Sequence, residues 1–360
     1  MGKPPALAQV YRRFGEVDAA GTSLLYERVA CALGESEEAL RAIETVPARK
    51  RQPALVLAAL HDLALAGRAP ALAAAYAARD AEAAAAAAIE TLVRRTDAVA
   101  AIVARRTVRA FGPGRCAVLY PALAEAARRL DAASVGLVDV ECAAGFNLSV
   151  DRVGITYDDG RVLGDPSSPV QTTASVVGGR AVPARAMPDV VARIGIDRDP
   201  VDVTDPADAR WLRACVWPDH SDGRARLNAE VALAATAPPT LMRGDAVDLL
   251  PEALARVPAD ALPVVTTTWA LSTLSAERRL RFLRRLDEAA ARRPVAWVSA
   301  EGVGVAPTVP TRGDRPASGH SIIGLAVFGG AAPQVEAIGR CWSRGRMLAW
   351  LGGAGEGGHG

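Results

Sequence analysis

An apolar run that ends in a turn of small residues is the feature that most constrains the fold. Residues 135–140 read Val-Gly-Leu-Val-Asp-Val, and Glu-Cys-Ala-Ala-Gly separates them from an amphipathic segment that begins near Phe146. A strand that leads through such a turn into a helix is typical of open α/β sheets, which present the helix N-terminus to a nucleotide-like ligand. The passage therefore predicts an α/β fold in which residues 135–140 form a central strand.

Further β-prone segments follow this strand, and the order of strands and acids predicts a mostly parallel sheet of seven strands. No convincing helix separates the last two segments, which are therefore expected to pair as an antiparallel hairpin that closes the sheet. The expected strands are residues 135–140, 194–197, the short segment before Gly244, and residues 262–268, 295–299, 322–328 and 347–351.

An insertion is expected between the first two strands. In nucleotide-binding folds, an acid that bonds the ribose follows the glycine turn by about 20 residues. Here Asp197 follows Asp139 by 58 residues. The intervening residues 152–190 are rich in turn formers and contain short β-prone pieces, with a turn signal at residues 158–160. They predict a β-hairpin excursion that could serve as a lid or face the substrate.

The first part of the chain has a different pattern. Residues 1–130 carry apolar residues at helical spacing and predict an all-α N-terminal domain, whereas residues 131–351 predict the α/β domain. The glycine-rich residues 352–360 are expected to be disordered. The expected helices are residues 6–19, 23–33, 37–43, 54–66, 70–94, 97–105 and 115–130.

Composition excludes several function classes. A formal charge of +2 indicates no polyanionic partner, and the arginines of residues 278–285 are interpreted as the solvated face of a helix rather than a nucleic-acid contact. The five cysteines are scattered singly, which argues against a structural zinc site and favours a reducing compartment. No signal peptide or membrane-spanning run is visible. A cytoplasmic protein with a small-molecule substrate is expected, and its oligomeric state stays open.

The turn after residues 135–140 resembles the first motif of class I S-adenosylmethionine (SAM) methyltransferases, an acid followed by glycines at alternate positions. Asp139 and Gly145 match that motif, whereas Glu141 and Ala143 stand where it has glycine. The resemblance implies a Rossmann-like sheet that binds SAM. It further implies that Asp197 bonds the ribose hydroxyls, and that Gly244 and Asp245 belong to the segment whose acid meets the adenine amino group.

The whole chain also resembles an uncharacterised bacterial family, a domain of unknown function with a methyltransferase-like C-terminal half. The motifs that carry this resemblance are spread over most of the chain. They include Arg51-Gln-Pro53, Gly114-Arg-Cys116, Ala144-Gly-Phe-Asn-Leu148, Trp217-Pro-Asp-His220 and Arg243-Gly-Asp-Ala-Val-Asp-Leu-Leu-Pro251.

Three side chains outside the turn are candidate catalytic residues. His220 could act as a general base, or its segment could simply be packed by Trp217. His61 could serve the chemistry or be a satisfied interior histidine. Arg115, at a helix start, could meet an anionic group of the ligand or anchor its loop. Asn147 could reach a bound ligand or cap its own helix.

Glu141 separates two functional hypotheses. Its carboxylate adds bulk and charge to a turn where a glycine would let the backbone approach the cofactor. If it faces the cationic end of SAM, it supports an enzyme that methylates a small molecule. If the site is altered, the protein is instead a non-catalytic ligand-binding or regulatory protein on a methyltransferase scaffold.

Overall fold

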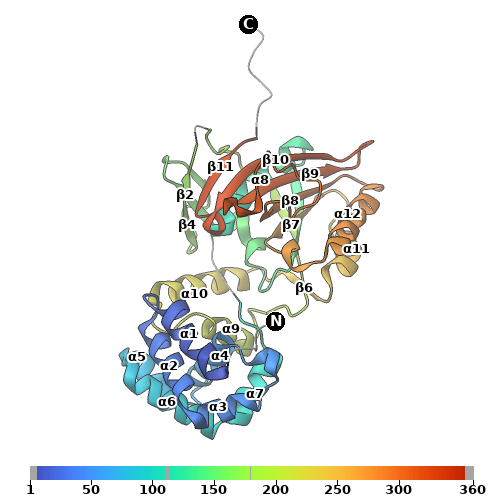
Figure 1. The fold of residues 1–360 in the computed structure, drawn as a ribbon. Helices are drawn as coiled ribbons and strands as arrows, with labels where there is room; N and C mark the ends of the chain where they lie inside the picture. The colour runs from blue at the N-terminus through green and yellow to red at the C-terminus, as the bar shows by residue number, and fades with distance from the viewer. Residues whose placement is uncertain (1–5, 110–113, 179, 353–360) are drawn as a thin grey trace. The chain divides into compact units, whose positions relative to one another are not determined.

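The computed structural model describes residues 6–109, 114–178 and 180–352. It contains two compact units (Figure 1). The helical unit comprises Met1–Phe111 and Asp205–Asn228, and the sheet unit comprises Gly112–Thr204 and Ala229–Gly360. The expected α/β class is confirmed, with a helical N-terminal region and a large mixed sheet. Residues 353–360, expected to be disordered, lie outside the described residues.

This division differs from the boundary predicted at residue 130. Helix α8 (Gly114–Arg129) belongs to the sheet unit, because its apolar side chains pack in one core with β1 (Ser134–Val140). The segment 205–228 belongs to the helical unit, because Trp211 is buried in that unit's core. The packing of α8 onto the sheet agrees with the expectation for residues 115–130, whereas the assignment of residues 205–228 was not predicted.

The helical unit is built from short helices around α4, whose side chains are buried on nearly every side. One predicted helix, residues 70–94, is in fact two. Arg79 adopts a left-handed conformation, and Asp80 accepts a hydrogen bond from the Ala83 N–H to start the second helix. The helices of this unit are α1 (Leu7–Arg13), the π-helix Phe14–Ala19, α2 (Leu24–Glu35), α3 (Glu37–Glu44), α4 (Pro53–Leu65), α5 (Pro70–Ala78), α6 (Ala81–Arg94), α7 (Thr96–Arg105) and α9 (Pro206–Ala214), with the first part of α10 (Ser221–Ala235).

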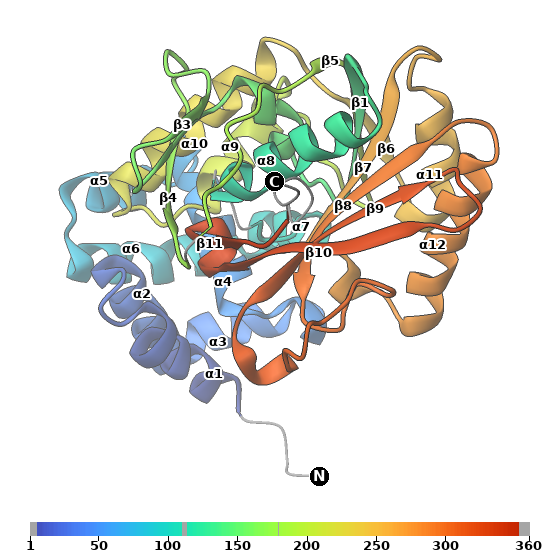
Figure 2. The same cartoon turned by 90° about the horizontal axis from the view of Figure 1, so that it is seen from above.

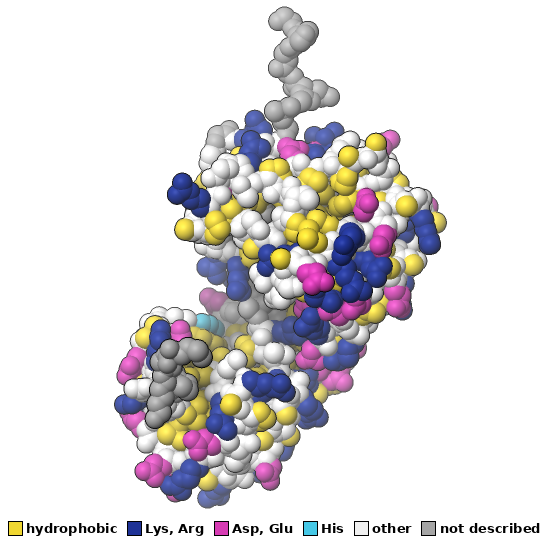
Figure 3. All heavy atoms as spheres, turned by 45° about the vertical axis from the view of Figure 1, so that its right-hand side comes forward, with side chains coloured by type: hydrophobic (Ala, Val, Ile, Leu, Met, Phe, Trp, Pro, Cys, Tyr) yellow, Lys and Arg dark blue, Asp and Glu magenta, His cyan; other side chains and the backbone are white. Residues whose placement is uncertain are grey.

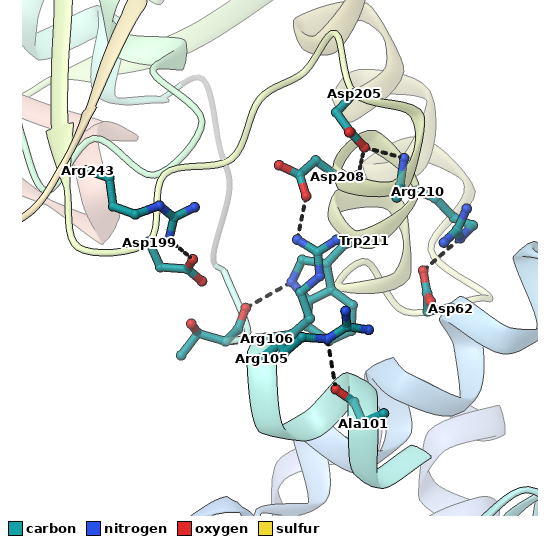
Figure 4. Close-up of polar contacts among 12 residues, drawn as sticks. Asp62, Ala101, Arg105, Arg106, Asp199, Asp205, Asp208, Arg210, Trp211 and Arg243 are labelled. Atoms are coloured by element: carbon teal, nitrogen blue, oxygen red, sulfur yellow. Dashed lines mark hydrogen bonds and ion pairs between the residues drawn. The ribbon is translucent and has the colours of Figure 1, made fainter. Parts of the chain in front are cut away.

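Figure 4 shows three of the polar contacts that fasten the segment 205–228 within the helical unit. Arg210 donates to Asp62 at 2.9 Å, and Arg106 donates to Asp208 at 2.5 Å. The Trp211 indole N–H donates to the Thr107 carbonyl at 3.0 Å. Among the described residues, no single helix has both the length and the apolar composition to cross a membrane, although α4 and α5 pass that test as a pair bent by 100°.

The sheet has eleven strands in the order β3-β2-β4-β11-β10-β9-β8-β7-β1-β5-β6. Strands β6, β5, β1, β7 and β8 run parallel, and β1 lies between β5 and β7 as expected. Helix α8 covers one face, and α11 (Ala246–Ala255) and α12 (Ala276–Ala290) cover the other (Figures 1 and 2). The parallel strands are β1, β5 (Asp189–Asp197), β6 (Thr240–Arg243), β7 (Leu262–Thr268) and β8 (Val295–Gly302).

The predicted closing hairpin is wrong. Strand β9 (Ser321–Phe328) pairs with β10 (Gln334–Trp342), and β10 in turn pairs with β11 (Met347–Trp350). The unrecognised strand β10 interrupts its apolar residues with Glu336 and Arg340. Both charges have ionic partners, Arg129 and Asp314 respectively, so the strand carries them at little cost.

The predicted β excursion is present as a hairpin of β2 (Gly154–Tyr157) with β3 (Val162–Gly164), followed by β4 (Gln171–Val176). Strand β4 pairs in parallel with β11. The excursion therefore extends the main sheet at its edge. Its strands are hydrogen-bonded into the sheet, so the excursion is not a separate lid.

The segment after β1 is also not the α-helix that was expected. Residues Phe146–Arg152 form a 3₁₀-helix that is interrupted at Ser149 and leads directly into β2. Its Leu148 and Val150 side chains are buried, and no long helical face is formed. The turn is therefore followed by a short 3₁₀-helix and not by an α-helix with a dipole along its axis.

Candidate functional site

The strand order places a topological switch point beside β1. The chain passes from β1 to β5 and β6 on one side, and then returns to β7 and β8 on the other. In open α/β sheets such a reversal opens a crevice at the carboxyl ends of the strands, where ligands bind. Buried and half-buried polar side chains gather at this edge, on the face covered by α8. This switch-point cluster consists of Arg115, Asp139, Asn147, Thr266 and Thr268.

Asp139 is the centre of the cluster and is only 1% exposed. The Thr266 hydroxyl donates to its Oδ1 at 2.6 Å, and the Asn147 Nδ2 donates to its Oδ2 at 3.1 Å. Burial raises the pKa of Asp139 to about 6, although the Thr266 hydrogen bond and the Arg115 charge act in the opposite direction. The carboxyl group can therefore hold or release a proton near neutral pH.

Arg115 supplies the positive charge of the cluster. Its guanidinium lies 5.4 Å from the Trp269 ring centroid and donates a 3.4 Å hydrogen bond to Thr268 Oγ1. Asn147 also donates to Thr268 Oγ1, at 3.1 Å. Burial lowers the pKa of Arg115, but the group remains a cation at any physiological pH. Arg115 and Asn147 thus share one acceptor beside Asp139.

A narrow cavity of about 10 Å³ adjoins the cluster, lined in part by Cys116, Phe146, Asn147 and Glu230. This is roughly the space of one water molecule. A ligand of nucleotide size does not fit there, because pockets for such ligands hold several hundred Å³. Such a ligand would have to lie over the strand ends, or the surrounding loops would have to open.

The turn after β1 has an unusual backbone. Glu141, Ala143 and Gly145 have φ angles of 56°, 52° and 72°, all in the left-handed region. These are the three positions at which the resembled methyltransferase motif has glycine. A left-handed conformation costs a non-glycine residue about 1–2 kcal/mol, and such strain gathers at functional sites. The chain therefore keeps a glycine-like backbone at two positions where it has no glycine.

Gly145 also meets a steric requirement. A Cβ atom at this position would lie 2.9 Å from Pro239 Cγ, which is closer than real Cβ contacts allow. With its positive φ, this close approach explains why position 145 favours glycine.

Asp197, predicted to bond a ribose, is only 1% exposed and is used to hold the turn. Its Oδ2 accepts a 2.8 Å hydrogen bond from the Ala143 N–H, and its Oδ1 accepts one of 2.8 Å from the Asp199 N–H. The carboxylate therefore ties the end of β5 to the strained turn. The structure brings Asp197 to the same sheet edge as Asp139, with both carboxylate oxygens already bonded to the backbone.

The third predicted element, Gly244 and Asp245, follows β6 at this edge. The Gly244 N–H donates to the Asp197 carbonyl at 2.9 Å. Asp245 caps α11 by accepting from the Val247 N–H at 3.0 Å, and it also pairs with Arg198 and Arg278. Burial alone would raise the pKa of Asp245, but these guanidinium and backbone donors hold it below its usual value.

Ion pairs such as Arg198–Asp245 recur on this unit's surface. Figure 3 shows basic and acidic side chains interspersed on the face that it draws.

The two predicted histidines lie in the helical unit, whereas Arg115 lies in the sheet unit. His61 is 3% exposed, its Nδ1 is 3.2 Å from the Ala214 carbonyl oxygen, and burial lowers its pKa to about 4. His220 stacks on Trp217, and its Nε2 lies 2.8 Å from the Thr22 carbonyl oxygen. Both rings make contacts typical of structural histidines.

Two features of the site were not predicted from the sequence. Thr266 and Thr268 alternate along β7 and therefore point to the face that carries Asp139, a period-two signal that was available. Glu301, at the end of β8, accepts hydrogen bonds of 3.0 Å from the Ala270 and Leu271 N–H groups. Burial raises the pKa of Glu301 to about 7.

In the part of the chain that the structure describes, no group of three or more His, Cys, Asp or Glu side chains could hold a metal ion.

Comparison with the curated proteins gives no match, and comparison with the solved structures gives none either. One family model, described as "Uncharacterized protein conserved in bacteria (DUF2332)", matches residues 8–350. This match confirms the expectation of an uncharacterised bacterial family. Because it covers nearly the whole length, the chain belongs to that family.

Proposed function

We propose that the sheet unit binds SAM at the carboxyl ends of β1, β5 and β7 and promotes transfer of its methyl group to a small-molecule acceptor. The observation that carries this proposal is the switch point beside β1, with buried acids at the ends of β1 and β5. A parallel sheet with this reversal is the setting in which nucleotide-like ligands bind. The order β6-β5-β1-β7-β8 is also that expected for a Rossmann-like sheet.

The strained turn gives the proposal a second support. Left-handed residues at 141, 143 and 145 preserve the backbone course that a glycine-rich cofactor turn needs. Because the Ala143 N–H is bonded by Asp197, the turn is held in place before any ligand binds. A rigid turn costs less ordering entropy when the ligand arrives.

Methyl transfer needs proximity and alignment more than acid–base machinery. SAM would supply an activated methyl group on a sulfonium. Of the chain's own groups, Arg115 and Asn147 are placed to hold a polar or anionic group of SAM, such as its carboxylate. Asp139, with a pKa of about 6, is placed to accept the proton that the acceptor loses.

A second function, ligand binding without catalysis, is supported by the contacts of two acids. Both carboxylate oxygens of Asp197 are bonded to the backbone, and Asp245 is bonded to two arginines and to its own helix. Acids already engaged in this way favour a scaffold that binds a ligand without turning it over. In this alternative the protein senses or carries a small molecule.

Calorimetric titration of the full chain with SAM tests the proposal. Wild type is expected to bind. Asn147→Ala and Arg115→Gln are each expected to weaken binding by about 1–3 kcal/mol, the range for a lost hydrogen bond to a charged group. Arg292→Gln, an exposed arginine of the sheet unit, is the matched control and should bind as wild type does.

Turnover separates the two classes. Incubation of the protein with SAM and a panel of small nucleophiles, followed by mass spectrometry of S-adenosylhomocysteine, is expected to show acceptor-dependent product. Binding without product would support the non-catalytic alternative. Absence of SAM binding by a folded wild type would contradict the proposal itself.

A further inference from the structure

A second cavity in the sheet unit lies apart from the switch-point cluster and shares no residue with it. It has a volume of about 450 Å³ and is lined by residues that follow β4, by β10, by the end of β11 and by Arg312 from a separate segment. These three strands are neighbours in the sheet (Figure 2). The volume is within the range of small-molecule pockets. Its charged lining residues are Arg180, Arg312, Glu336 and Arg340.

Two of these four charges are balanced by partners. Arg340 donates two hydrogen bonds to the Asp314 carboxylate, at 2.6 and 3.1 Å. These bonds keep the pKa of Asp314 below its usual value, so the pair remains ionised. Glu336 accepts a 2.7 Å hydrogen bond from Arg129. Neither pair contributes a net charge to the cavity.

The other two arginines form no ion pair with a carboxylate of residues 6–109, 114–178 or 180–352. Arg180 donates to the main-chain carbonyl oxygens of Leu351 and Gly352, at 2.6 and 3.3 Å, and these neutral acceptors leave its charge in place. Arg312 is exposed and forms no ion pair with any residue that the structure describes. Counting the described lining residues alone, the cavity has a net charge of about +2, from two guanidinium groups on different segments.

The identity of the ligand follows from charge and shape. A carboxylate carries one negative charge, whereas a phosphate ester carries about −1.5 to −2 near pH 7 and offers three acceptor oxygens. Guanidinium groups bind phosphate through paired N–H donors. The half-buried Val177, Ala349 and Leu351 line the same cavity and provide contact for an organic group. We propose that this cavity binds a small organic phosphate.

Titration of the full chain with phenyl phosphate in a phosphate-free buffer tests this inference. Wild type is expected to bind, and Arg312→Gln is expected to weaken binding at least about tenfold, because a charged hydrogen bond is lost. Arg180→Gln should do the same. Since Arg180 also holds residues 351 and 352, Arg312→Gln is the variant that remains interpretable if Arg180→Gln perturbs folding. Arg292→Gln is the exposed-arginine control and should leave affinity unchanged.

Benzoate and inorganic phosphate define the chemical class. Benzoate is expected to bind at least about tenfold more weakly than phenyl phosphate, because it carries less charge. Inorganic phosphate should also bind more weakly, because it lacks the organic group. Equal affinity for benzoate would overturn the assignment to phosphates. Absence of binding by wild type, or equal losses in Arg312→Gln and Arg292→Gln, would overturn the site. None of these outcomes depends on SAM binding.

Discussion

Asp139 and Thr266 are direct partners across the parallel pair β1–β7, and the Thr266 hydroxyl donates a 2.6 Å hydrogen bond to the Asp139 carboxylate. Both side chains are buried. The bond therefore joins the end of the central strand to its neighbour at the switch point. A donor to a buried carboxylate matters more than most hydrogen bonds, because its loss leaves the acceptor desolvated and unpaired.

Replacing Thr266 with Val tests this relationship. The substitution keeps the branched shape and removes only the hydroxyl, so it should lower the free energy of unfolding by about 1–3 kcal/mol. Urea denaturation monitored by circular dichroism measures the change. Thr173→Val, at an exposed position of β4, is the matched control and should change stability by less than about 0.5 kcal/mol. Equal effects of the two variants would show that the Asp139 contact is energetically unimportant.

Glu301 predicts a pH effect with a defined sign. Its pKa is about 7 in the folded chain and 4.5 as the reference, so the folded state binds the proton more tightly. The stability that this group contributes is therefore present below about pH 4.5 and falls as the pH rises to about 7. Glu301→Gln keeps an acceptor for the Ala270 and Leu271 N–H groups and removes the buried charge.

This variant is expected to be more stable than wild type at pH 8, by about 1–3 kcal/mol, and to differ little from it at pH 4.5. Denaturation at several pH values measures the difference. Asp248→Asn, a change at a half-exposed carboxylate of the same unit, serves as the control for the loss of a negative charge. A stability difference between Glu301→Gln and wild type that does not vary with pH would contradict the raised pKa.

Asp62 tests whether the segment 205–228 is held in the helical unit. Its side chain is 9% exposed and accepts a 2.9 Å hydrogen bond from Arg210. Asp62→Asn weakens that bond and leaves the arginine partly buried without its counter-charge, which should cost about 1–3 kcal/mol. Limited proteolysis should then cleave more rapidly between residues 205 and 228. Glu37→Gln, which removes an exposed ion pair with Arg41, should have little effect. Unchanged proteolysis of Asp62→Asn would show that other contacts suffice.

Glu141 distinguishes an enzyme from a pseudoenzyme. If the turn binds SAM and Glu141 meets its cationic end, Glu141→Gly should weaken SAM binding measurably in a side-by-side titration. A gain in affinity would indicate an altered site that the glycine restores. Ala143→Gly is the matched control, because it relieves a similar left-handed strain without changing charge. No change in affinity would place the ligand away from this turn.

The sequence predicted those strands whose apolar residues form an uninterrupted local run. The apolar run 135–140 and the segment before Asp197 are buried strands of the parallel sheet, because continuous apolar runs favour strands covered on both faces. Strand β10 was not predicted, because Glu336 and Arg340 interrupt its run of apolar residues. Their ionic partners lie far away in the sequence. The assignment of residues 205–228 also depended on tertiary packing of Trp211.

The sequence predicted which residues lie at the candidate site better than it predicted the hydrogen bonds that they make there. Asp139, Asn147 and Arg115 do come together, but Asp197 bonds the turn itself. No pattern in a single sequence tells whether a strand-end acid faces a ligand or a backbone N–H. His61 and His220 were candidates because imidazole can act as a general base. In the structure, a ring nitrogen of each lies beside a main-chain carbonyl oxygen.

The helical unit is assembled from two pieces of chain that are separated by β1 to β5, and this has a consequence for biosynthesis. Ala214, which contacts His61, is made 153 residues later. At a translation rate of ~5–20 residues per second, the delay is ~8–30 s. During that interval the first helices have emerged from the ribosome without Trp211 to complete their core. The apolar surface that Trp211 later covers therefore stays open while the first strands of the sheet are being synthesised.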